Sequence, residues 1–572
     1  MYSSKKNVLI LLSLLKAHGV RHVVISPGSR NLSIVRGVQT DPFFICHSVV
    51  DERSAAYFAN GLATKTREPV MLTCTSAQAT RNYIPGMTQA FYQGSKLVVV
   101  TADWVPSKIG QGVMQTVLQM SLPSDAARIS VNLPIVGDRS SWNYCARLVN
   151  EALLELDHHG TGPVHINVPI EEHWDGATDV LPRVRKINRT LPGGELPELH
   201  NRRVMIAIGE HPPFSSDEVE AMEAFAKKFD AAIYSNHLSN FPSKTHQLSR
   251  LKMTGLGRLQ GRTLKPDVLI TIGGQIGDYD FDSMLRRIRF EHWRVHPDGR
   301  VQDTYGQLTQ IFEYSEKPFF NEYLSKSDGV TASGFARAWV ETVAEPIIPS
   351  QLPLSHASIA ATLAPKIPPG SLLHFGILSA LRNWTYFKVD TSVECYANVA
   401  SFGIDGSMST FIGQSRATNS LALLVIGDLS FFYDMNSLGI KGTGSNVRVL
   451  LVNNSGGGEF RQHTHAAQKH FGEDANEYTA AAGHNGSAKS WAESMGWEYL
   501  AVDKKSQLNH ACNWILGDSD APLLMEVRTT MEDDADALEL LRGLNSSETL
   551  EKRASRVLPS GIVSKLKKVA DR

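Results

Sequence analysis

The first part of the chain alternates short apolar runs with amphipathic stretches. The apolar runs, each bounded by turn residues, occupy 22–26, 43–46, 70–74, 97–101 and 164–168. Stretches with helical periodicity, such as 52–63, lie between them. Strands that alternate with helices in this way are typical of a parallel sheet covered by helices on both faces. We therefore predict a doubly wound α/β domain over residues 1–185.

Two breaks interrupt the rest of the chain. Residues 179–199 are rich in Pro, Gly and charged residues, and residues 346–353 are rich in Pro, as linkers often are. Further apolar runs follow these breaks at 204–209, 268–274, 372–375, 421–426, 447–452 and 523–527. The length of 572 residues accommodates three such regions. The predicted fold class is thus α/β, with three doubly wound parallel-sheet domains at 1–185, 200–345 and 354–572.

The N-terminus allows two interpretations. Lys5 and Lys6 precede the apolar run 8–12, as they would at the start of a secretory signal peptide. The run ends early, at Lys16, and the predicted strand 22–26 follows at once, which favours a buried first helix. No apolar run approaches the length of about 18 residues that a membrane span requires.

Charge and cysteine content exclude several functions. The chain has 57 basic and 58 acidic residues, and this balance argues against nucleic acid or an anionic membrane as the main partner. The five cysteines are scattered and form no C-x-x-C pair, which excludes a disulfide framework and a cysteine zinc site. We therefore expect a cytoplasmic protein that acts on small molecules.

The strongest chemical signal lies in the third region, where two predicted strands end in polar motifs. Asp428 follows the run 421–426 in the motif Gly-Asp-Leu-Ser, and Asn454 follows the run 447–452 in the motif Asn-Asn-Ser-Gly. Ligands bind at the carboxyl edge of open parallel sheets, and carboxylate, amide and carbonyl oxygens are ligands that Mg²⁺ prefers. Each motif alone is also a common turn. Together they predict a site for Mg²⁺ and a diphosphate.

This pair of motifs resembles the diphosphate- and metal-binding motif of thiamine diphosphate enzymes. The resemblance implies that Mg²⁺ is held by Asp428, Asn454 and the backbone carbonyl of Gly456. It also implies a pyrimidine-binding (PYR) domain at 1–185, a central domain at 200–345 and a diphosphate-binding (PP) domain at 354–572. The residues it implies for binding thiamine diphosphate are Pro27, Ser76, Gly403, Ile404, Gly427, Leu429, Ser430 and Asn453.

Such an enzyme needs a carboxyl group against the aminopyrimidine ring of the cofactor. This group bonds the ring nitrogen and favours the imino form, which accepts the proton from the reactive thiazolium carbon. Glu52 lies in the first turn of a predicted helix that Asp51 is placed to cap. A carboxylate is favoured there by the helix dipole alone. With the motifs of the third region in the same chain, we predict Glu52 as the catalytic residue.

Further motifs resemble one branch, the 2-succinyl-5-enolpyruvyl-6-hydroxy-3-cyclohexene-1-carboxylate synthases of menaquinone biosynthesis. These motifs are Ser-Pro-Gly-Ser-Arg ending at Arg30, Asp-Glu-Arg-Ser-Ala from Asp51, Thr-Ser at 75–76 and Gly-Ile-Asp-Gly-Ser from Gly403. The resemblance implies a homodimer or homotetramer with the cofactor at the subunit interface. It implies decarboxylation of 2-oxoglutarate and transfer of the acyl carbanion to isochorismate. The candidate substrate residues are Ser29, Arg30, Gln78, Gln115, Arg416, Glu459 and His463.

Several positions depart from the pattern of that branch, and three of them change the charge or polarity of the substrate site. Val399 and Trp104 stand where it has arginines, and Glu459 replaces an apolar residue. Burying the carboxylates of a dianionic donor without partner cations is expensive. The interpretation favoured by these changes is a carboligase with another donor, such as pyruvate, or another acceptor. The synthase reaction itself remains an alternative, as does a cofactor-binding scaffold without turnover, which the presence of Glu52 disfavours.

Three histidines near Glu459 also allow two interpretations. His463, His465 and His470 could form a transition-metal cluster. Their position directly behind the Asn-Asn motif instead favours a loop over the cofactor, where imidazoles often transfer protons.

Overall fold

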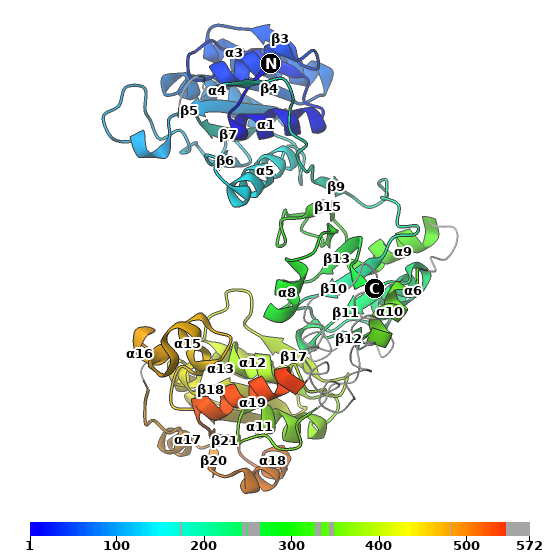
Figure 1. Cartoon of the computed structure of the whole chain (residues 1–572), viewed down its shortest axis with the longest axis vertical. Coiled ribbons are helices and arrows are strands. Elements are labelled where there is room, and N and C mark those ends of the chain that lie inside the picture. Colours follow the sequence, from blue (N-terminus) through cyan, green and yellow to red (C-terminus); the bar gives the residue numbers. More distant parts are fainter. Residues whose placement is uncertain are drawn as a thin grey trace, which may run out of the picture. The chain divides into compact units, whose positions relative to one another are not determined.

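The computed structural model describes residues 1–544 apart from 172, 173, 175, 243–246, 249–263, 327–332, 343–347 and 482. It divides into two compact units, shown in the ribbon of Figure 1. Unit 1 comprises Met1–Gly194 and Pro297–Glu313, and unit 2 comprises Glu195–His296 and Tyr314–Arg572.

Unit 1 is built around a six-stranded parallel sheet with the order β3-β2-β4-β5-β7-β6. The strands are β2 (His22–Ile25), β3 (Ile45–Ser48), β4 (Val70–Cys74), β5 (Leu97–Asp103), β6 (Ser130–Asn132) and β7 (Val164–Pro169). The helices are α1 (Lys6–Ala17), α2 (Leu32–Thr40), α3 (Glu52–Thr66), α4 (Gln78–Gln93) and α5 (Arg139–Leu154). Two further pairs complete the unit: β1 (Tyr2–Ser3) with β8 (Ala177–Thr178), and β9 (Asn188–Thr190) with β15 (Leu308–Phe312).

The helices of unit 1 cover both faces of this sheet. Side chains of successive strand residues point to opposite faces, so Val23 packs with α1, α2 and α5, whereas Val24 packs with α3 and α4. The predicted doubly wound α/β arrangement is therefore confirmed in this unit. Helix α1 is buried along most of its length, as predicted. The predicted strand 43–46 begins two residues later, at Ile45, because the Asp41 carboxylate accepts the Phe43 N–H and holds a turn there.

Unit 2 contains two sheets, and the first is parallel with the order β12-β11-β10-β13-β14. Its strands are β10 (Val204–Ile208), β11 (Ala232–Tyr234), β12 (Gln247–Leu248), β13 (Val268–Ile272) and β14 (Glu291–Val295). The accompanying helices are α6 (Ser216–Phe229), α8 (Tyr279–Leu285), α9 (Glu316–Lys326) and α10 (Phe335–Thr342). Helix α6 begins with a capping box, in which Ser215 and Glu218 satisfy each other's backbone N–H groups.

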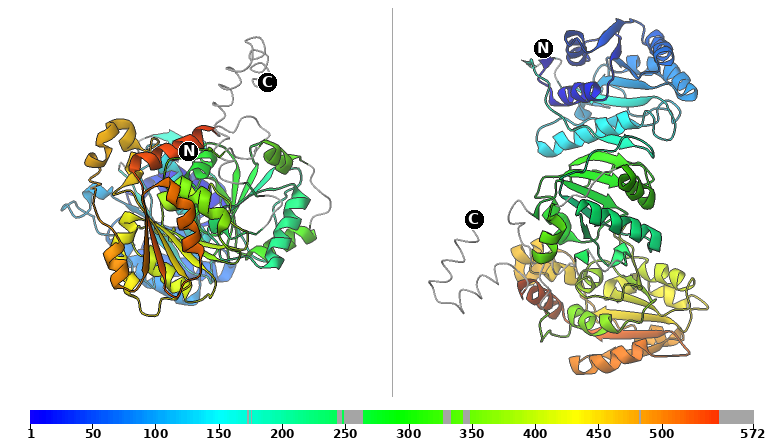
Figure 2. Two further views of the ribbon diagram at one scale, coloured as in Figure 1. Left: turned by 90° about the horizontal axis from the view of Figure 1, so that it is seen from below. Right: turned by 90° about the vertical axis from the view of Figure 1, so that its right-hand side faces the viewer.

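The second sheet of unit 2 is parallel and six-stranded, with the order β17-β16-β18-β19-β21-β20. Its strands are β16 (Leu372–Phe375), β17 (Glu394–Ala397), β18 (Ala422–Gly427), β19 (Val447–Asn453), β20 (Glu498–Val502) and β21 (Leu523–Arg528). Helices α11 (His356–Leu363), α12 (Ser379–Trp384), α18 (Leu508–Leu516) and α19 (Met531–Leu544) pack on one face. Helices α13 (Ser407–Ser415), α14 (Asp428–Tyr433) and α17 (Lys489–Ser494) pack on the other. Two short helices, α15 (Ala466–Phe471) and α16 (Ala475–Tyr478), follow β19, and Figure 2 shows the layers from two further sides.

The sequence analysis missed the short or partly exposed strands. Strands β17 and β20 form the two edges of the second sheet of unit 2 and carry partly exposed residues, and their apolar runs, at 395–397 and 499–502, were not recognised as strands. The three domain ranges stay a prediction, and residues 545–572 of the predicted PP domain lie outside the described part of the chain. Among the described residues, no helix combines the length and the apolar character needed to cross a membrane.

Candidate functional site

The predicted metal ligands meet at the carboxyl edge of the second sheet of unit 2. Strands β18 and β19 are neighbours in register, with Gly427 beside Val452, so the residues that follow them lie at one edge. Asp428 begins α14 and is 3% exposed. The backbone N–H of Gly456 donates to Asp428 Oδ2 at 3.0 Å, and that of Leu429 donates to Oδ1 at 2.7 Å. The hydrogen bond from Gly456 to Asp428 therefore joins the two motifs, which are far apart in the sequence, at one edge of the sheet.

Asn454 offers an oxygen that the protein itself does not use. Its amide nitrogen donates to Asp534 Oδ2 at 2.9 Å, which fixes the orientation of the amide. Its Oδ1 is buried and has no hydrogen-bond partner in the described part of the chain. A buried acceptor left unpaired costs about 1–3 kcal/mol, and a cation would relieve this cost. Together with the Asp428 carboxylate, this oxygen fits the ligand set of Mg²⁺.

The loop after β19 has an unusual backbone conformation. Ser455 has φ +66° and Gly456 has φ +156°, a region that residues with a Cβ rarely adopt. The side chain of Asn453 holds this loop: its Oδ1 accepts the Ser455 N–H at 3.1 Å, and its Nδ2 donates to the Gly486 carbonyl at 2.9 Å. Because these partners occupy the amide, Asn453 shapes the loop, and its contact with the cofactor stays a prediction.

Glu526 on β21 anchors this arrangement, and the sequence analysis missed it. The carboxylate is fully buried, and Asn453 Nδ2 donates to its Oε1 at 2.6 Å. Its Oε2 accepts from Ser487 Oγ at 2.8 Å, from the Ala488 N–H at 3.1 Å and from the Tyr499 hydroxyl at 2.7 Å. Four donors compensate the burial of one charge. The available signal was a single acidic residue within the apolar run 523–527.

His484 is a second residue that sequence reasoning missed. Its Nδ1 accepts the Gly486 N–H at 3.0 Å, so the proton of the neutral ring resides on Nε2. Nε2 lies 3.2 Å from Asp428 Oδ2 and donates to it. Burial raises the pKa of Asp428, while the hydrogen bond from Leu429 and the nearby His484 act in the opposite direction. His484 thus orients the carboxylate that the metal would use.

The remaining cofactor candidates of unit 2 surround the same edge. The Ser430 hydroxyl donates to the Ile404 carbonyl, which joins the start of α14 to the segment around Gly403. A Cβ built on Gly427 meets no heavy atom within 4 Å, so the backbone there is open. Gly403, Ile404, Gly427, Leu429 and Ser430 therefore belong to one locality, and their contacts with the cofactor stay predictions.

The structure changes the interpretation of Glu459. Arg382 Nη1 donates to Glu459 Oε2 at 2.6 Å, and Nη2 donates to Oε1 at 3.1 Å. The Arg382 guanidinium is 7% exposed and lies 5.6 Å from the centre of the Tyr279 ring. A bidentate ion pair therefore neutralises the negative charge that Glu459 adds, and its role in substrate binding stays a prediction.

The other two substrate candidates of unit 2 have exposed partners. His463 Nε2 lies 3.0 Å from Asp536 Oδ1, and Arg416 Nη2 donates to the Lys441 carbonyl at 2.5 Å. Their roles in substrate binding stay predictions. Among the described residues, His463, His465 and His470 do not converge into a metal cluster. His465 instead caps α15, since its Nδ1 accepts the Ala467 N–H at 3.1 Å.

Glu52 begins helix α3 in unit 1, directly after β3. Asp51 caps the helix, as predicted, by accepting the Arg53 N–H at 3.0 Å and the Ser54 hydroxyl at 2.9 Å. The Glu52 side chain is partly exposed and makes no hydrogen bond or ion pair within the described part of the chain. Its carboxyl group is thus free to bond an external ring nitrogen.

The other cofactor candidates of unit 1 follow β2 and β4. Pro27 is exposed in the turn after β2, and a Cβ on the next residue, Gly28, would lie only 2.3 Å from the Thr75 Cβ. Only glycine allows these two turns to approach so closely. Ser76 is 2% exposed, and its hydroxyl oxygen has no hydrogen-bond partner among the described residues.

A buried glutamine that the sequence analysis missed fixes the start of α4. Gln119 Oε1 accepts the Ala77 N–H at 2.7 Å, while Ala77 has φ +65° and Gln78 begins the helix. Gln119 is 1% exposed, whereas the predicted substrate residue Gln115 is exposed. The buried side chain of Gln119 therefore fixes the turn between Ser76 and Gln78 through this hydrogen bond.

Arg30 is largely occupied within the protein. It is 4% exposed, donates to the Ile170 carbonyl at 2.7 Å and lies 3.4 Å from the centre of the Trp104 ring. Trp104, which replaces an arginine of the family pattern, thus covers one face of Arg30 through a cation–π contact. The neighbouring Ser29 is exposed.

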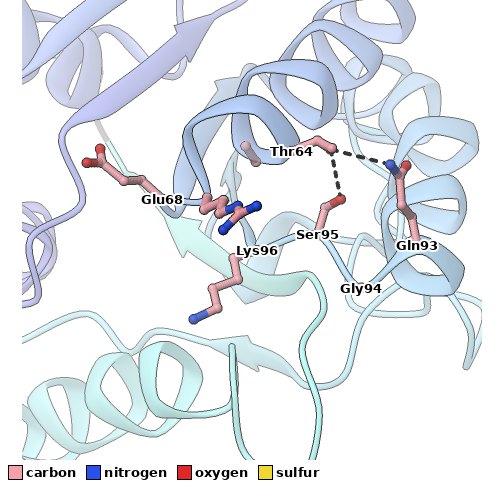
Figure 3. A pocket seen from close by; sticks show the side chains of 8 residues that line it. Thr64, Glu68, Gln93, Gly94, Ser95 and Lys96 are labelled. Atoms are coloured by element: carbon pink, nitrogen blue, oxygen red, sulfur yellow. Dashed lines mark hydrogen bonds between the residues drawn. The ribbon is translucent and has the colours of Figure 1, made fainter.

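A hollow on unit 1 lies away from these residues. It is formed by the end of α3 and the α4–β5 loop, and Thr64, Gln93, Ser95 and Lys96 line it (Figure 3). The Thr64 hydroxyl lies 3.4 Å from Ser95 Oγ and 3.4 Å from Gln93 Nε2. The hollow is at the amino end of β5, whereas Glu52 and Ser76 follow carboxyl ends of strands. It therefore contributes nothing to the predicted cofactor site.

Comparison with known proteins places two segments of the chain in one family. Residues 8–122 match the thiamine pyrophosphate enzyme, N-terminal TPP binding domain, and include Glu52. Residues 384–527 match the thiamine pyrophosphate enzyme, C-terminal TPP binding domain, and include Asp428, Asn454 and Gly456.

Relatives of similar length extend the match across the chain. The chain is 38% identical to a 2-succinyl-5-enolpyruvyl-6-hydroxy-3-cyclohexene-1-carboxylate synthase of Bacteroides fragilis, over 94% of this chain and 99% of the relative. It is 36% identical to the protein of that name from Phocaeicola vulgatus, over 96% of this chain and 100% of the relative. It is 30% identical to the protein of that name from Flavobacterium johnsoniae, over 92% of this chain and 96% of the relative. The chain therefore belongs to the thiamine pyrophosphate-dependent enzymes, within the family of 2-succinyl-5-enolpyruvyl-6-hydroxy-3-cyclohexene-1-carboxylate synthases.

Proposed function

We propose that this enzyme decarboxylates a 2-oxo acid and transfers the acyl unit to an acceptor, with thiamine diphosphate and Mg²⁺ as cofactors. The leading candidate is the synthase reaction that the family resemblance implies, with 2-oxoglutarate as donor and isochorismate as acceptor. Its support is identity of 36–38% over nearly the whole chain. The observation that carries the chemistry is the buried, unpartnered Oδ1 of Asn454 beside the Asp428 carboxylate.

The residues divide the work of holding the cofactors. Asp428, Asn454 Oδ1 and the Gly456 carbonyl would hold Mg²⁺, while Asp534 and His484 orient two of these groups. When bound, thiamine diphosphate supplies a carbon nucleophile for the 2-oxo group and an electron sink for the loss of CO₂.

Glu52 would hold a proton at the aminopyrimidine ring nitrogen. Its carboxyl group has no hydrogen bond or ion pair within the described residues, so it is available for this contact. A positioned carboxyl group acting as general acid or base contributes about 10²–10⁴-fold to a rate.

The enzyme is proposed to act as a homodimer or homotetramer with the cofactor at the subunit interface. Apolar side chains next to Glu52 support this, because Val50, Tyr57 and Phe58 are 73%, 47% and 45% exposed. A second subunit would cover them. Light scattering on the purified protein tests the proposal, and a monomer that is fully active would contradict it.

A second candidate function, with a smaller donor such as pyruvate, has its own support. Val399 is fully buried among apolar side chains and offers no cation, and Trp104 covers one face of Arg30. Fewer free cations favour a donor with one carboxylate. The ion pair of Glu459 with Arg382 removes one argument for this candidate and leaves the other two.

Steady-state assays separate these functions. CO₂ release and the coupled product are measured with 2-oxoglutarate and isochorismate, and in parallel with pyruvate. Turnover of the first pair supports the synthase reaction, and turnover restricted to pyruvate supports the second candidate. Glu52→Gln should abolish activity and retain cofactor binding, with exposed Glu68→Gln as the matched control. Wild-type protein that binds the cofactor and releases no CO₂ from either donor would support a scaffold.

A further inference from the structure

Two histidines and a glutamate converge in unit 1, at a place separate from the predicted cofactor residues. His158 and His159 lie in the turn after α5, and Glu313 follows β15. His159 Nε2 lies 2.6 Å from Glu313 Oε1, and His158 Nε2 lies 3.7 Å from Glu313 Oε2. One ligand atom from each residue lies within 4.8 Å of those of the others. Each oxygen of Glu313 thus faces a different imidazole.

A second carboxylate fixes the ring of His158. His158 Nδ1 lies 2.7 Å from Glu155 Oε1, so this nitrogen donates to Glu155. A carboxylate on the far nitrogen of a histidine is the usual support of a metal-binding imidazole. The opposite nitrogen, Nε2, faces two oxygens, the Asp298 carbonyl at 2.9 Å and Glu313 Oε2. A nitrogen between oxygens requires a cation at that point, either a proton or a metal ion.

Two arginines build the scaffold of this cluster. Arg189 donates to the Leu154 carbonyl at 2.8 Å and to the Gly299 carbonyl at 3.1 Å. Arg128 donates to the Glu155 carbonyl at 2.9 Å and to the His158 carbonyl. Arg128 thereby fixes the backbone of the turn after α5, and Arg189 links the end of α5 to the segment around Gly299. The histidines are presented on a backbone that is already fixed.

Two carboxylates face the cluster and attract a cation. The side chains of Glu155 and Glu313 are 22% and 13% exposed, and Arg189 is the cation paired with both, at 3.6 Å and 3.8 Å. Arg128 brings a second positive charge to the turn through its hydrogen bonds to the backbone carbonyls of Glu155 and His158. The two guanidinium groups balance the two carboxylates, so the arrangement of the ligand atoms, and not a net negative charge, supports a metal site here.

The cluster has space and access. A Cβ on Gly299 would lie 2.4 Å from Glu313 Oε2 and 3.0 Å from His158 Nε2, and Gly299 has φ +59°. Only glycine leaves this point free. The His159 side chain is 59% exposed and lines a hollow with Arg128 and Glu155 that is open to solvent. A hydrated ion can therefore reach the cluster and keep a water ligand.

We propose that His158, His159 and Glu313 form a Zn²⁺ site that clamps the end of α5 to the end of β15. Two imidazoles and one carboxylate suit Zn²⁺, which takes a water as its fourth ligand in such sets. Mg²⁺ prefers oxygen ligands, so the two metal sites differ in ligand chemistry. The clamp is independent of the proposed reaction.

Zinc binding to the full-length enzyme, saturated with thiamine diphosphate and Mg²⁺, tests the proposal. Protein stripped with a chelator is dialysed free of it, resaturated with thiamine diphosphate and Mg²⁺, and titrated with Zn²⁺ against a coloured competitor, and bound zinc is counted by mass spectrometry after gel filtration. Wild type should retain one Zn²⁺ per chain. His159→Ala, at an exposed position, should lose most of this affinity, and Glu155→Gln should weaken it about 10–100-fold. Exposed His510→Ala on α18 is the matched control and should bind as wild type does.

Two results would overturn the proposal. One is wild-type protein that binds no more Zn²⁺ than His159→Ala, which would leave a proton as the cation at His158. The other is His510→Ala losing as much zinc as His159→Ala. If His159→Ala does not fold, Glu313→Gln replaces it, and X-ray absorption of zinc-loaded wild type must show two imidazole ligands.

Discussion

Replacing Glu526 by glutamine should loosen the metal-binding loop from a distance. The buried carboxylate accepts four hydrogen bonds, one at Oε1 from Asn453 and three at Oε2. Glutamine keeps the shape and loses the charge, and its NH₂ group must face at least one donor. In the less damaging orientation of the glutamine amide, its oxygen takes the place of Oε2 and keeps three hydrogen bonds, whereas its NH₂ group faces Asn453 Nδ2 and that hydrogen bond is lost.

The cost of this substitution can be worked from these contacts. One hydrogen bond to a charged group is lost, and three others become neutral bonds of roughly half the strength. We expect the free energy of unfolding to fall by about 2–4 kcal/mol, within the range known for breaking buried polar networks. Because Asn453 loses one of the two acceptors of its amide nitrogen and keeps only Gly486, its hold on Ser455 should weaken, and Mg²⁺ affinity should fall about 10–100-fold, as for other residues that support metal ligands.

Two measurements check this prediction. Urea denaturation of the apo protein reports stability, and isothermal titration of Mg²⁺ with thiamine diphosphate present reports metal affinity. Glu498→Gln on the neighbouring strand β20 is the matched control, because that carboxylate is exposed. Glu526→Gln protein with the stability and Mg²⁺ affinity of wild type would refute the reasoning, since the buried network would then carry no energy.

Four further outcomes are expected. Glu52→Gln should lower kcat about 10²–10⁴-fold while thiamine diphosphate still binds, as fluorescence titration will show; unchanged kcat contradicts its role. Asn454→Ala should weaken Mg²⁺ binding because it removes the unpartnered oxygen, and it should lower the free energy of unfolding by about 1–3 kcal/mol because it also removes the hydrogen bond to Asp534; calorimetry with unchanged affinity would exclude this ligand. Glu459→Ala should lower the free energy of unfolding by about 3 kcal/mol by removing the bidentate carboxylate partner of the buried Arg382 guanidinium, and Arg382→Met in the same background should recover part of the loss. Burial lowers the pKa of His165 from 6.5 to about 4, so its neutral form is favoured in the folded state and stability is lost as pH falls from 6.5 towards 4. Urea midpoints across that range should slope less in His165→Gln, and an equal slope would refute the assignment.

The central strands were predictable because burial leaves a local trace. Strands β18 and β19 are covered on both faces, so they appear in the sequence as continuous apolar runs. The carboxyl ends of these two strands were predictable as well, because the polar residues Asp428 and Asn454 end the apolar runs. Edge strands such as β20 are covered less completely, and their apolar runs are shorter.

The supporting residues of the site could not be read in this way. Glu526 is 73 positions from Asn453, and His484 is 56 positions from Asp428. A hydrogen bond between distant residues leaves no periodic pattern, because any residue of suitable chemistry can supply either partner. Only the neighbouring positions of β19 and β21 in the sheet bring Glu526 to Asn453.

The sequence by itself determined the element types and the chemistry of the candidate ligands, since both depend on residue type and on apolar patterns over a few positions. The tertiary structure decided which polar groups already have a hydrogen-bond or ion-pair partner within the protein. Glu459 reads as an added negative charge in the sequence, whereas its counter-ion Arg382 lies 77 positions away. In the sequence, Asn454 is typical of a turn. In the structure, its Nδ2 donates to Asp534, whereas its Oδ1 has no partner among the described residues. The physical reason is that satisfaction of a buried group depends on its neighbours in space, which the fold assembles from distant segments.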